Sequence, residues 1–416
     1  MSLAEVELWS LMEAFFRENG LVKQHLDSYN TFIEHGLQEV IDEVGEIPIE
    51  ILERSFKIKL GKIEVGRPRI VEVDGSDHPI YPMEARLRNL TYAAPMWLEL
   101  SEVHDGKESS IEPVYIGDIP IMLKSVYCPL SGMTPEELIE KGEDPKDPGG
   151  YFIVNGSERV IVALEDLAPN RVLIDVDRSV SVPIYRAKVF STTVGFRARI
   201  ELRLKSDGAL YVSMPGVPAE IPFVILMKAL GLESDKEIAD AVSPDKVLQD
   251  QLEPSFEKGI GVSTTKDGIL FIGNRVAHGQ IEEYRIKKAE TILDKNFMPH
   301  IGRTTDKRVE KALFLGEMAS RVIELKLDQR KSDDKDHYAN KRLKLAGPLL
   351  ADLFRIAFRS LCRDVKYQLE RMSIRRHEAG LIAAAVRPGI ITERIQHALA
   401  TGNWGRGKVG ITQLLD

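Results

Sequence analysis

The longest regular pattern of apolar residues in this chain lies between residues 345 and 369. Apolar side chains recur there three or four positions apart, which is the spacing of one face of an α-helix, over about seven turns. They are Leu345, Leu349, Leu350, Leu353, Phe354, Ala357, Phe358, Leu361, Val365 and Leu369. Gly347 and Pro348 stand near its start, where a proline needs no amide donor. The pattern predicts one long helix with a single buried face.

The residues before 165 mix helical and strand patterns, so they predict an α+β domain. Residues 8–44 have helical spacing, whereas residues 56–73 alternate between apolar and polar side chains, with breaks at Gly61 and Arg67-Pro68. The further expected elements are a turn or short helix at 81–92 that enters a strand, a strand at 114–123, a helix beginning at Thr134-Pro135, and a hairpin at 151–162 with Asn155-Gly156 as its turn.

The composition changes after Leu164. Residues 171–211 contain several alternating strands, with Ser206-Asp207-Gly208 as a tight turn, and residues 221–327 are mostly helical. A small hairpin is expected around 268–272, where glycine stands beside apolar residues. Residues 165 to about 330 therefore predict a separate α+β module, inserted between two parts of the first domain.

Length and composition limit the class of protein. The 416 residues predict roughly two or three domains, and a hydrophobic fraction of 43% is enough for ordinary cores. Charges interrupt every apolar segment, so no membrane-spanning helix is expected. The two cysteines, Cys128 and Cys362, are too far apart for a CxxC metal site. We expect an intracellular, cytoplasmic chain without a disulfide.

The net charge of −8 is unevenly distributed. Twelve acidic and five basic residues fall between residues 1 and 60, whereas six basic and three acidic residues fall between 375 and 416. An acidic chain with a basic end is typical of a protein that meets nucleic acid on one face only.

Four basic residues of the long helix, Arg355, Arg359, Arg363 and Lys366, recur at helical spacing and form one basic edge. Such an edge is most often simply solvated, but it also suits contacts to phosphates or to a neighbouring subunit. The flanking pairs Lys341-Arg342 and Arg375-Arg376 favour contact with an anion.

The segment Gly402–Lys408 has the spacing of a Walker A loop, G-x-x-x-x-G-K. The required Ser or Thr is replaced by Val409, no buried strand precedes the loop, and Trp404 is unusual inside a phosphate cradle. Two interpretations remain, namely a basic loop that contacts phosphates or bases, and a solvated glycine-rich turn.

The charged run Lys331–His337 contains side chains that bind metals, since carboxylates and imidazoles are ligands for divalent ions. Neighbouring lysines compete for those carboxylates, so Asp333, Asp334, Asp336 and His337 favour a loop held by salt bridges. The other histidines are scattered, no G-x-S-x-G elbow occurs, and no catalytic group is expected.

The run Gly149-Gly150-Tyr151-Phe152-Ile153-Val154-Asn155-Gly156-Ser157-Glu158-Arg159-Val160 resembles a hallmark segment of the second-largest subunit of multisubunit DNA-directed RNA polymerases. Further segments resemble that family in the same order along the chain. They are Phe15–Val22, Tyr81–Tyr92, Asp334–Tyr338, Lys341–Pro348 and Ala398–Gly405. Short loops such as 99–113 are similar to the archaeal form, in which the subunit can be split and its N-terminal piece is called B-double-prime.

The resemblance implies a multidomain α+β fold in which helices and an antiparallel sheet form a protrusion with an inserted α+β lobe. The expected ranges are 1–164 and 336–373 for the protrusion, 165–335 for the lobe and 374–416 for the start of a fork region. Two fork loops, 377–388 and 403–410, would lie near the RNA–DNA hybrid. Strand contacts are a hypothesis for Arg387, Trp404, Arg406 and Lys408, with Lys341, Arg342, Arg375 and Arg376 as further nucleic-acid contacts.

The resemblance also implies partners and excludes a catalytic role for this chain alone. Catalysis in the family is two-metal nucleotidyl transfer, with Mg expected on the largest subunit, and no cofactor or metal is expected here. Its pattern would continue beyond Asp416 into further active-centre segments. Expected partners are the largest polymerase subunit, the complementary C-terminal half of the second-largest subunit, other polymerase subunits, DNA, the RNA–DNA hybrid and general transcription factors, but no membrane. The alternative functions are a free-standing adaptor for transcription factors and a nucleotide hydrolase using Gly402–Lys408.

Overall fold

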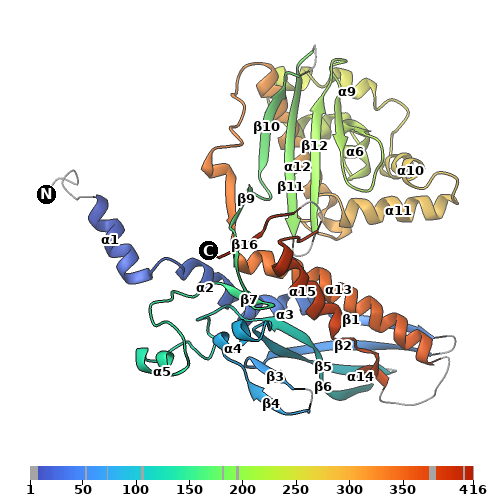
Figure 1. Cartoon of the computed structure of the whole chain (residues 1–416). Coiled ribbons are helices and arrows are strands. Elements are labelled where there is room, and N and C mark those ends of the chain that lie inside the picture. The colour runs from blue at the N-terminus through green and yellow to red at the C-terminus, as the bar shows by residue number, and fades with distance from the viewer. Residues whose placement is uncertain are drawn as a thin grey trace. The chain divides into compact units, whose positions relative to one another are not determined.

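The computed structural model describes residues 8–51, 54–72, 74–104, 107–179, 182–193, 196–373, 381–405 and 408–415. The chain forms two compact units (Figure 1). The first unit comprises Met1–Glu165 and Leu343–Asp416, and the second comprises Asp166–Arg342. The chain re-enters the first unit at Leu343, where residue 336 was expected, and the residues expected to begin a fork region belong to the first unit.

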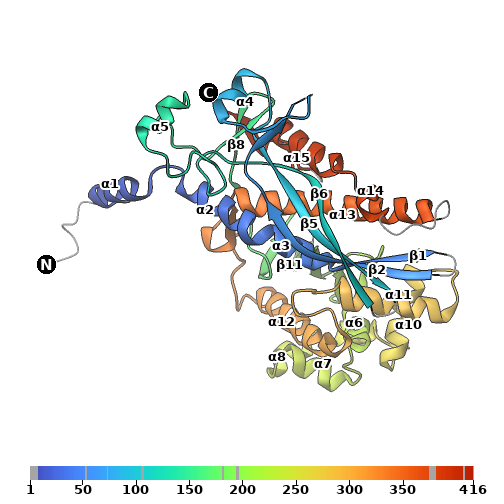
Figure 2. The ribbon, with the colours of Figure 1, turned by 90° about the horizontal axis from the view of Figure 1, so that it is seen from below.

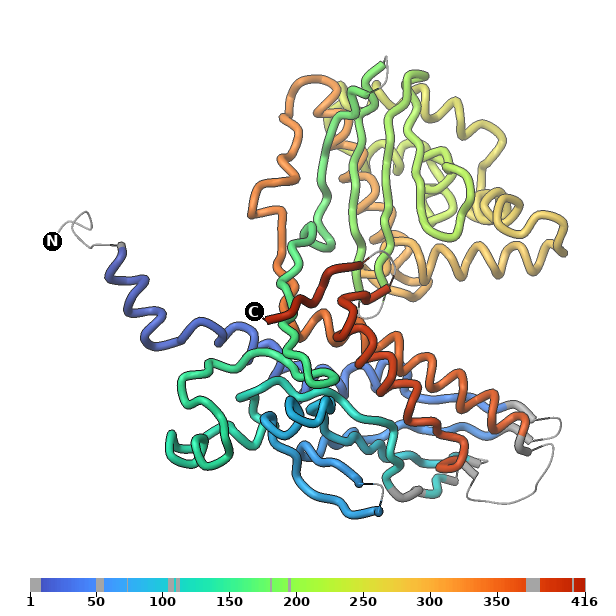
Figure 3. The backbone as a smooth tube through the Cα atoms, viewed as in Figure 1, coloured from blue at the N-terminus to red at the C-terminus, as the bar shows by residue number. Residues whose placement is uncertain are grey.

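Two short strands carry the chain out of the first unit and back into it. They are β9 (Leu164–Leu167) and β15 (Lys341–Lys344), which form a two-stranded sheet and can be followed along the backbone in Figure 3.

The first unit is built on an antiparallel sheet of four strands in the order β1-β2-β5-β6. The strands are β1 (Glu46–Ile51), β2 (Arg54–Val65), β5 (Ala93–His104) and β6 (Lys107–Pro120). The register between β2 and β5 shifts after Leu60, which places a bulge at the predicted break of Gly61. A Cβ on Gly61 would lie only 3.0 Å from the Cβ of Glu99, so close strand approach explains the glycine.

The expected helical stretch 8–44 consists of α1 (Leu8–Asn19), α2 (Lys23–Thr31), a π-helical turn (Phe32–Gly36) and α3 (Leu37–Val44). Gly20, with a φ of +65°, separates the first two, because a left-handed residue cannot continue an α-helix. Figure 2 shows α13 (Ala346–Ser373) alongside α3, and α13 contacts α2, α3 and β1.

Helix α13 confirms the prediction of one long helix with a single buried face. The apolar positions from Leu349 to Leu369 are buried, while Leu345 precedes the helix and is half-buried. Gly347 lets the first turn approach α2 closely, and its backbone N–H donates to Oγ of Ser28 at 3.0 Å. A Cβ at this position would collide with the carbonyl oxygen of Ser28.

The predicted Asn-Gly hairpin is confirmed by β7 (Phe152–Val154) and β8 (Ser157–Ile161). Asn155 and Gly156 have φ values of +51° and +76°, as a two-residue turn with both central residues left-handed requires. Strand β16 (Thr412–Leu414) extends this sheet by pairing with β8. The smaller elements of the first unit are β3 (Arg69–Val71), β4 (Asp77–Pro79), α4 (Pro82–Leu87), α5 (Pro135–Glu140), α14 (Leu381–Ala385) and α15 (Gly389–Thr401).

The second unit has its own core around an antiparallel sheet in the order β10-β11-β12-β13-β14. The strands are β10 (Val172–Asp177), β11 (Ile184–Thr193), β12 (Phe196–Leu204), β13 (Leu210–Ser213) and β14 (Ile221–Pro222). The helices are α6 (Phe223–Ala229), α7 (Asp235–Val242), α8 (Lys246–Asp250), α9 (Glu253–Glu257), α10 (Thr265–Val276), α11 (Glu282–Lys295) and α12 (Arg308–Lys326). Helix α12 packs on β10, β11 and β12 through buried residues such as Leu315 and Met318.

The hairpin expected around residues 268–272 is wrong, because these residues lie inside α10. Thr264 begins the helix with a capping box that Asp267 completes. Gly268 and Gly273 serve close packing and not a turn. A Cβ on Gly268 would lie 2.8 Å from the backbone N of Ala229 in α6, and one on Gly273 would lie 2.7 Å from the carbonyl oxygen of Arg285 in α11.

Candidate nucleic-acid interface

Arg355, the first residue of the predicted basic edge, forms an ion pair within the first unit. Its Nη2 donates to Oε1 of Glu43 in α3 at 2.9 Å, and its Nε donates to Oε2 at 2.9 Å. These two side chains are only 13% and 12% exposed. Arg359 lies 3.4 Å from the same carboxylate. This part of the edge therefore joins α13 to α3, because both arginines pair with the carboxylate of Glu43.

The later part of the edge remains at the surface. Lys366 lies 3.8 Å from Glu370, one helical turn further on. Arg363 is exposed and has no carboxylate within 4.0 Å among the residues that the structure describes. Of the four predicted residues, Arg363 is therefore the most accessible to an anion.

Asp352 of α13 is the centre of a positively charged cluster. It accepts a hydrogen bond from Nη1 of Arg355 at 2.9 Å, and it lies 3.3 Å from Nζ of Lys408 and 3.8 Å from Nζ of Lys344. One carboxylate thus meets three cations. We call Lys344, Asp352, Arg355 and Lys408 the Asp352 cluster, and the gathering of three cations makes it a candidate for a phosphate contact in the first unit.

The loop that carries Lys408 is fixed by its own backbone. The N–H of Trp404 donates to the carbonyl of Lys408 at 3.0 Å, and the N–H of Lys408 donates to the carbonyl of Gly405 at 3.1 Å. The loop follows helix α15 and leads into strand β16. A Walker A loop has the opposite order, because it follows a strand and opens a helix. The nucleotide-hydrolase alternative therefore lacks its structural context.

Trp404 was expected to contact a nucleic-acid strand, but its side chain is 2% exposed and belongs to the core of the first unit. Its Nε1 donates to the carbonyl oxygen of Leu349 at 2.8 Å. A base stacks on an exposed aromatic face, and this indole presents none. The packing thus disfavours a stacking role for Trp404.

Arg387 lies between α14 and α15 at the surface, with 58% of its side chain exposed. Its Nε donates to Oδ2 of Asp364 in α13 at 2.7 Å, and its Nη2 donates to Oδ1 of the same carboxylate. This pairing raises the pKa of the Arg387 guanidinium above its ordinary value. The contact orients a cation at the surface while leaving much of it accessible.

The remaining predicted contacts fall elsewhere. Lys341 lies 3.4 Å from Asp336, and the exposed Arg342 donates to the backbone carbonyls of Ala339 and its neighbour Lys341. Both basic residues belong to the second unit, at the start of strand β15, whose last residue is Lys344. Three further predicted contacts, Arg375, Arg376 and Arg406, lie outside the described residues.

The acidic run before Lys341 is held by local contacts. Asp333 accepts a hydrogen bond from the N–H of Ile174 at 2.9 Å, and Asp336 lies 2.8 Å from Nζ of Lys335. Nδ1 of His337 accepts from the N–H of Ala339 at 3.1 Å. These contacts support a loop held by salt bridges and backbone hydrogen bonds, as its interleaved lysines indicated.

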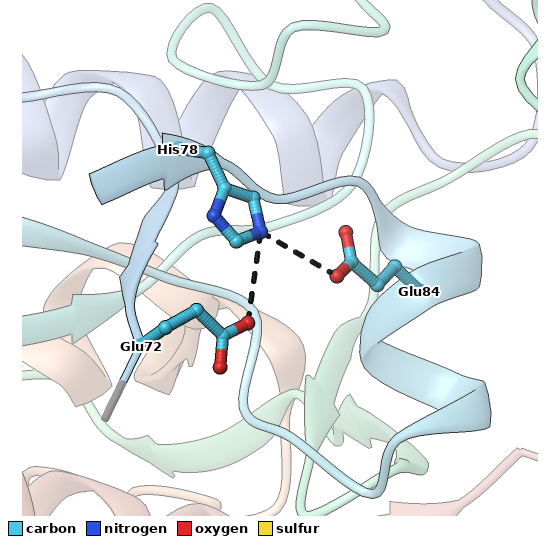
Figure 4. Close-up of side chains that lie close together, drawn as sticks. All are labelled: Glu72, His78 and Glu84. Carbon is cyan, nitrogen blue, oxygen red and sulfur yellow. Dashed lines mark ion pairs between the residues drawn. The ribbon is translucent and has the colours of Figure 1, made fainter. Parts of the chain in front are cut away.

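A group of metal-ligating side chains that the sequence did not suggest lies at the β3–β4 hairpin (Figure 4). Nε2 of His78 lies 3.8 Å from Oε1 of Glu72 and 3.8 Å from Oε1 of Glu84. Nη1 of Arg88 lies 2.7 Å from both of these oxygens. Because the guanidinium already pairs with both carboxylates, their arrangement is that of an ion-pair network and does not favour a metal ion.

Comparison with known proteins defines the class of this chain. A sequence model of the family described as RNA polymerase beta subunit matches residues 20–393. The chain belongs to this family.

The relatives include two kinds of protein. Subunit Rpo2 of DNA-directed RNA polymerase from Saccharolobus shibatae is 55% identical over 410 residues, which are 99% of this chain and 36% of that relative. Subunit Rpo2N from Methanococcus vannielii is 50% identical over 413 residues, or 98% of this chain and 82% of the relative. Rpo2N from Methanocaldococcus jannaschii is 48% identical, with the same shares. The chain thus spans about a third of the length of the Rpo2 relatives.

Among the described residues, no helix combines the length and apolar character needed to cross a membrane.

Proposed function

We propose that this chain forms the amino-terminal part of the second-largest subunit of an archaeal DNA-directed RNA polymerase. The family match and the similarity to Rpo2N along 98% of the chain support this assignment. In this proposal the first unit up to residue 373 is the protrusion, the second unit is the lobe, and the residues after 373 begin the fork region. The partners are the largest subunit, the complementary C-terminal half of the second-largest subunit and the other polymerase subunits.

The exposed apolar face of α1 is the observation that best supports assembly of this chain into a larger complex. Trp9, Leu11 and Phe15 are 71%, 57% and 57% exposed, and Met12 and Phe16 are exposed beside them. Several large apolar side chains on one short helix mark a surface that a partner covers. A free-standing adaptor for transcription factors, the alternative function, predicts a chain without such a surface.

Within the assembly, this chain would supply walls around the DNA and the RNA–DNA hybrid. The carboxylates and Mg of nucleotidyl transfer are expected on the largest subunit, so the chain would be inactive alone. Lys408 and Arg387 are its candidate phosphate contacts in the first unit, and Lys341 and Arg342 are those in the second. Such contacts depend on charge and salt and carry no sequence information. General transcription factors would dock on the outer surfaces of the assembly.

Co-purification tests the assembly. We expect the tagged chain from its native cells to bring along the largest polymerase subunit and the complementary half of its own subunit, identified by mass spectrometry. Replacement of Phe15 and Trp9 by Glu should abolish this recovery, whereas Ile260→Glu, which also charges an exposed apolar residue, should not. Recovery of the chain alone, or with transcription factors but without polymerase, would favour the adaptor.

Open-complex formation tests the phosphate contacts. In the reconstituted polymerase, Lys408→Ala and Arg406→Ala should each weaken the open complex and lower its salt dependence by about one ion per lost contact. Lys62→Ala removes a lysine that pairs with Glu64 at the surface of β2, and it serves as the control. An unchanged salt dependence in Lys408→Ala would contradict this contact.

A further inference from the structure

A groove of 580 Å3 lies in the first unit beside β5 and the β3–β4 hairpin, and the functions described above do not use it. The rings of Trp97 and Tyr81 line it. Four prolines contribute the other apolar walls, namely Pro68, Pro79, Pro95 and Pro129. The volume is within the range of sites that bind a small molecule or a few residues of a peptide.

Trp97 is held in place by two contacts, so the groove is already formed in this chain. A Cβ on Gly66 would lie 2.9 Å from the indole of Trp97, which shows how closely the backbone supports the ring. The guanidinium of Arg69 also lies 5.0 Å from the ring centroid. Arg69 is itself fixed by Asp77 across the hairpin, at 2.5 Å. A preformed aromatic surface reduces the entropy that binding costs.

The rim of the groove carries more positive than negative charge. Arg67 is exposed and donates to the carbonyl of Val126 at 3.2 Å, and no carboxylate within 4.0 Å of it lies in the described part of the chain. Nζ of Lys141 lies 4.8 Å from the centroid of Tyr81. Two arginines, Arg67 and Arg69, thus line the groove with one acid, Asp77, and Asp77 is already paired with Arg69.

We propose that this groove binds an extended segment of a partner protein, with a proline or aliphatic side chain on Trp97 and a flanking carboxylate on Arg67. Grooves walled by aromatic rings bind proline-containing segments, which are extended before they bind. Tryptophan, tyrosine and arginine are also the residues enriched at the centres of protein interfaces. Because Arg67 meets no carboxylate in the described part of the chain, it would favour a segment with a flanking acidic residue. The proposal goes beyond the assembly proposed above and does not depend on it.

The surroundings favour an acidic peptide over a nucleic acid. Besides Asp77, which lines the groove, Glu72 of the same hairpin and Glu84 of α4 face His78. A nucleic-acid strand carries a charge at every phosphate, so several of its charges would meet these carboxylates. A peptide can place one carboxylate at Arg67 and apolar side chains elsewhere.

Fluorescence anisotropy with the purified full chain tests the proposal. The probes are two labelled nonapeptides with the same proline-leucine centre, one flanked by aspartates and the other by lysines, and a labelled oligodeoxynucleotide. We expect the acidic peptide to bind and the other two probes to bind at least tenfold more weakly. Arg67→Glu should weaken the acidic peptide at least tenfold and strengthen the lysine-flanked one. Arg171→Glu reverses an exposed arginine that, like Arg67, donates to a backbone carbonyl, here that of Ala339, and it should change neither.

Trp97→Leu tests the apolar contact and should also weaken the acidic peptide, with thermal unfolding measured to verify that the variant folds. If Trp97→Leu unfolds, the proposal is tested by Arg67→Glu alone, through the expected reversal of the preference between the acidic and the lysine-flanked peptide. An exposed arginine can be replaced without disturbing the core. Absence of binding by the acidic peptide, or binding that Arg67→Glu leaves unchanged, would overturn the proposal. Tighter binding of the oligodeoxynucleotide, lost in Arg67→Glu, would assign the groove to nucleic acid instead. All these outcomes are measured on the isolated chain, so they are distinguishable from a failure to co-purify with polymerase.

Discussion

The indole Nε1 of Trp404 donates a hydrogen bond to the carbonyl oxygen of Leu349 in α13, 2.8 Å away. This contact ties the loop after α15 to the first turns of the long helix. We expect Trp404→Ala to lower the free energy of unfolding by about 3–5 kcal/mol, since it removes a large buried side chain. Trp404→Phe retains most of the packing and should cost less. Denaturant unfolding of the purified variants provides the measurement.

The same variants separate a packing role from nucleic-acid stacking. If Trp404 packs in the core, Trp404→Phe should lower stability and leave the nucleic-acid affinity of the assembled polymerase unchanged. A variant with unchanged stability and reduced affinity would contradict the packing and restore Trp404 as a strand contact.

Arg355→Ala should be strongly destabilising, because it leaves Glu43 as a charge that is 12% exposed and has only Arg359 nearby. Breaking one side of a buried ion pair costs about 3–5 kcal/mol. The double variant Arg355→Met with Glu43→Gln should recover part of that loss, since it removes both charges. Arg363→Ala, on the exposed part of the same helix, should change stability by less than about 0.5 kcal/mol. Equal effects of Arg355→Ala and Arg363→Ala in urea unfolding would show that the contact with Glu43 does not stabilise the fold.

Gly347→Ala tests the close approach of α13 to α2. The added methyl group would collide with the carbonyl oxygen of Ser28, so the helices must separate and the hydrogen bond between Gly347 and Ser28 lengthens. We expect a loss of about 1–3 kcal/mol, as for overpacking in a core, although alanine is the better helix former. Gly132→Ala is a control at a glycine whose Cβ would meet nothing within 4 Å, and its cost comes only from its φ of +86°. A stabilised Gly347→Ala variant in thermal unfolding would contradict the close approach.

His300 predicts a pH dependence for the second unit. Its Nδ1 lies 2.7 Å from Oγ of Ser191, its ring packs edge-on against Phe314, and burial followed by the charge of Lys311 lowers its pKa. Below pH 6.5 the unfolded chain therefore takes up a proton that the folded unit resists, so stability falls as the pH drops through and below that value. Calorimetric unfolding between pH 7.5 and 5 measures the loss.

His300→Gln should lose less stability than the wild type across the same pH range, because its amide still bonds to Ser191 but does not titrate. The variant His278→Gln changes an exposed histidine of the same unit and should follow the wild type. A pH dependence that His300→Gln leaves intact would assign the effect to other groups.

Local patterns predicted the parts of the fold that depend on local chemistry. The spacing of apolar residues defined α13, and Asn155-Gly156 defined a hairpin because few residues other than asparagine and glycine adopt a left-handed turn. The same reasoning failed at Gly268, where the glycine serves the packing of α6 against α10. Nothing in the neighbouring residues reveals such a distant contact, so a glycine inside a helix looks like a turn.

The sequence predicted which positions of the candidate site are charged, but it did not predict which residues those charges contact. The spacing of Arg355 and Arg359 correctly placed them on one edge of α13, but their partner Glu43 comes from more than three hundred positions earlier in the chain. The Asp352 cluster likewise needs the return of the chain to bring Lys408 to α13. Trp404 was expected to contact a strand because the resemblance places it in a fork loop, whereas the fold turns its ring into the core. No pattern in the sequence indicates the groove at Trp97, because its walls come from four separate segments of the chain.

The N–H of Ala168 donates to the carbonyl of Asn340 at 2.8 Å, so the second unit begins and ends at one place. A domain whose two ends meet can be removed from its host by joining the chain across a short gap, without stretching either flank. The same geometry allows the host to tolerate replacement of the insert by an unrelated domain with adjacent termini. We therefore expect the two units of this chain to be exchangeable as separate modules among members of the family.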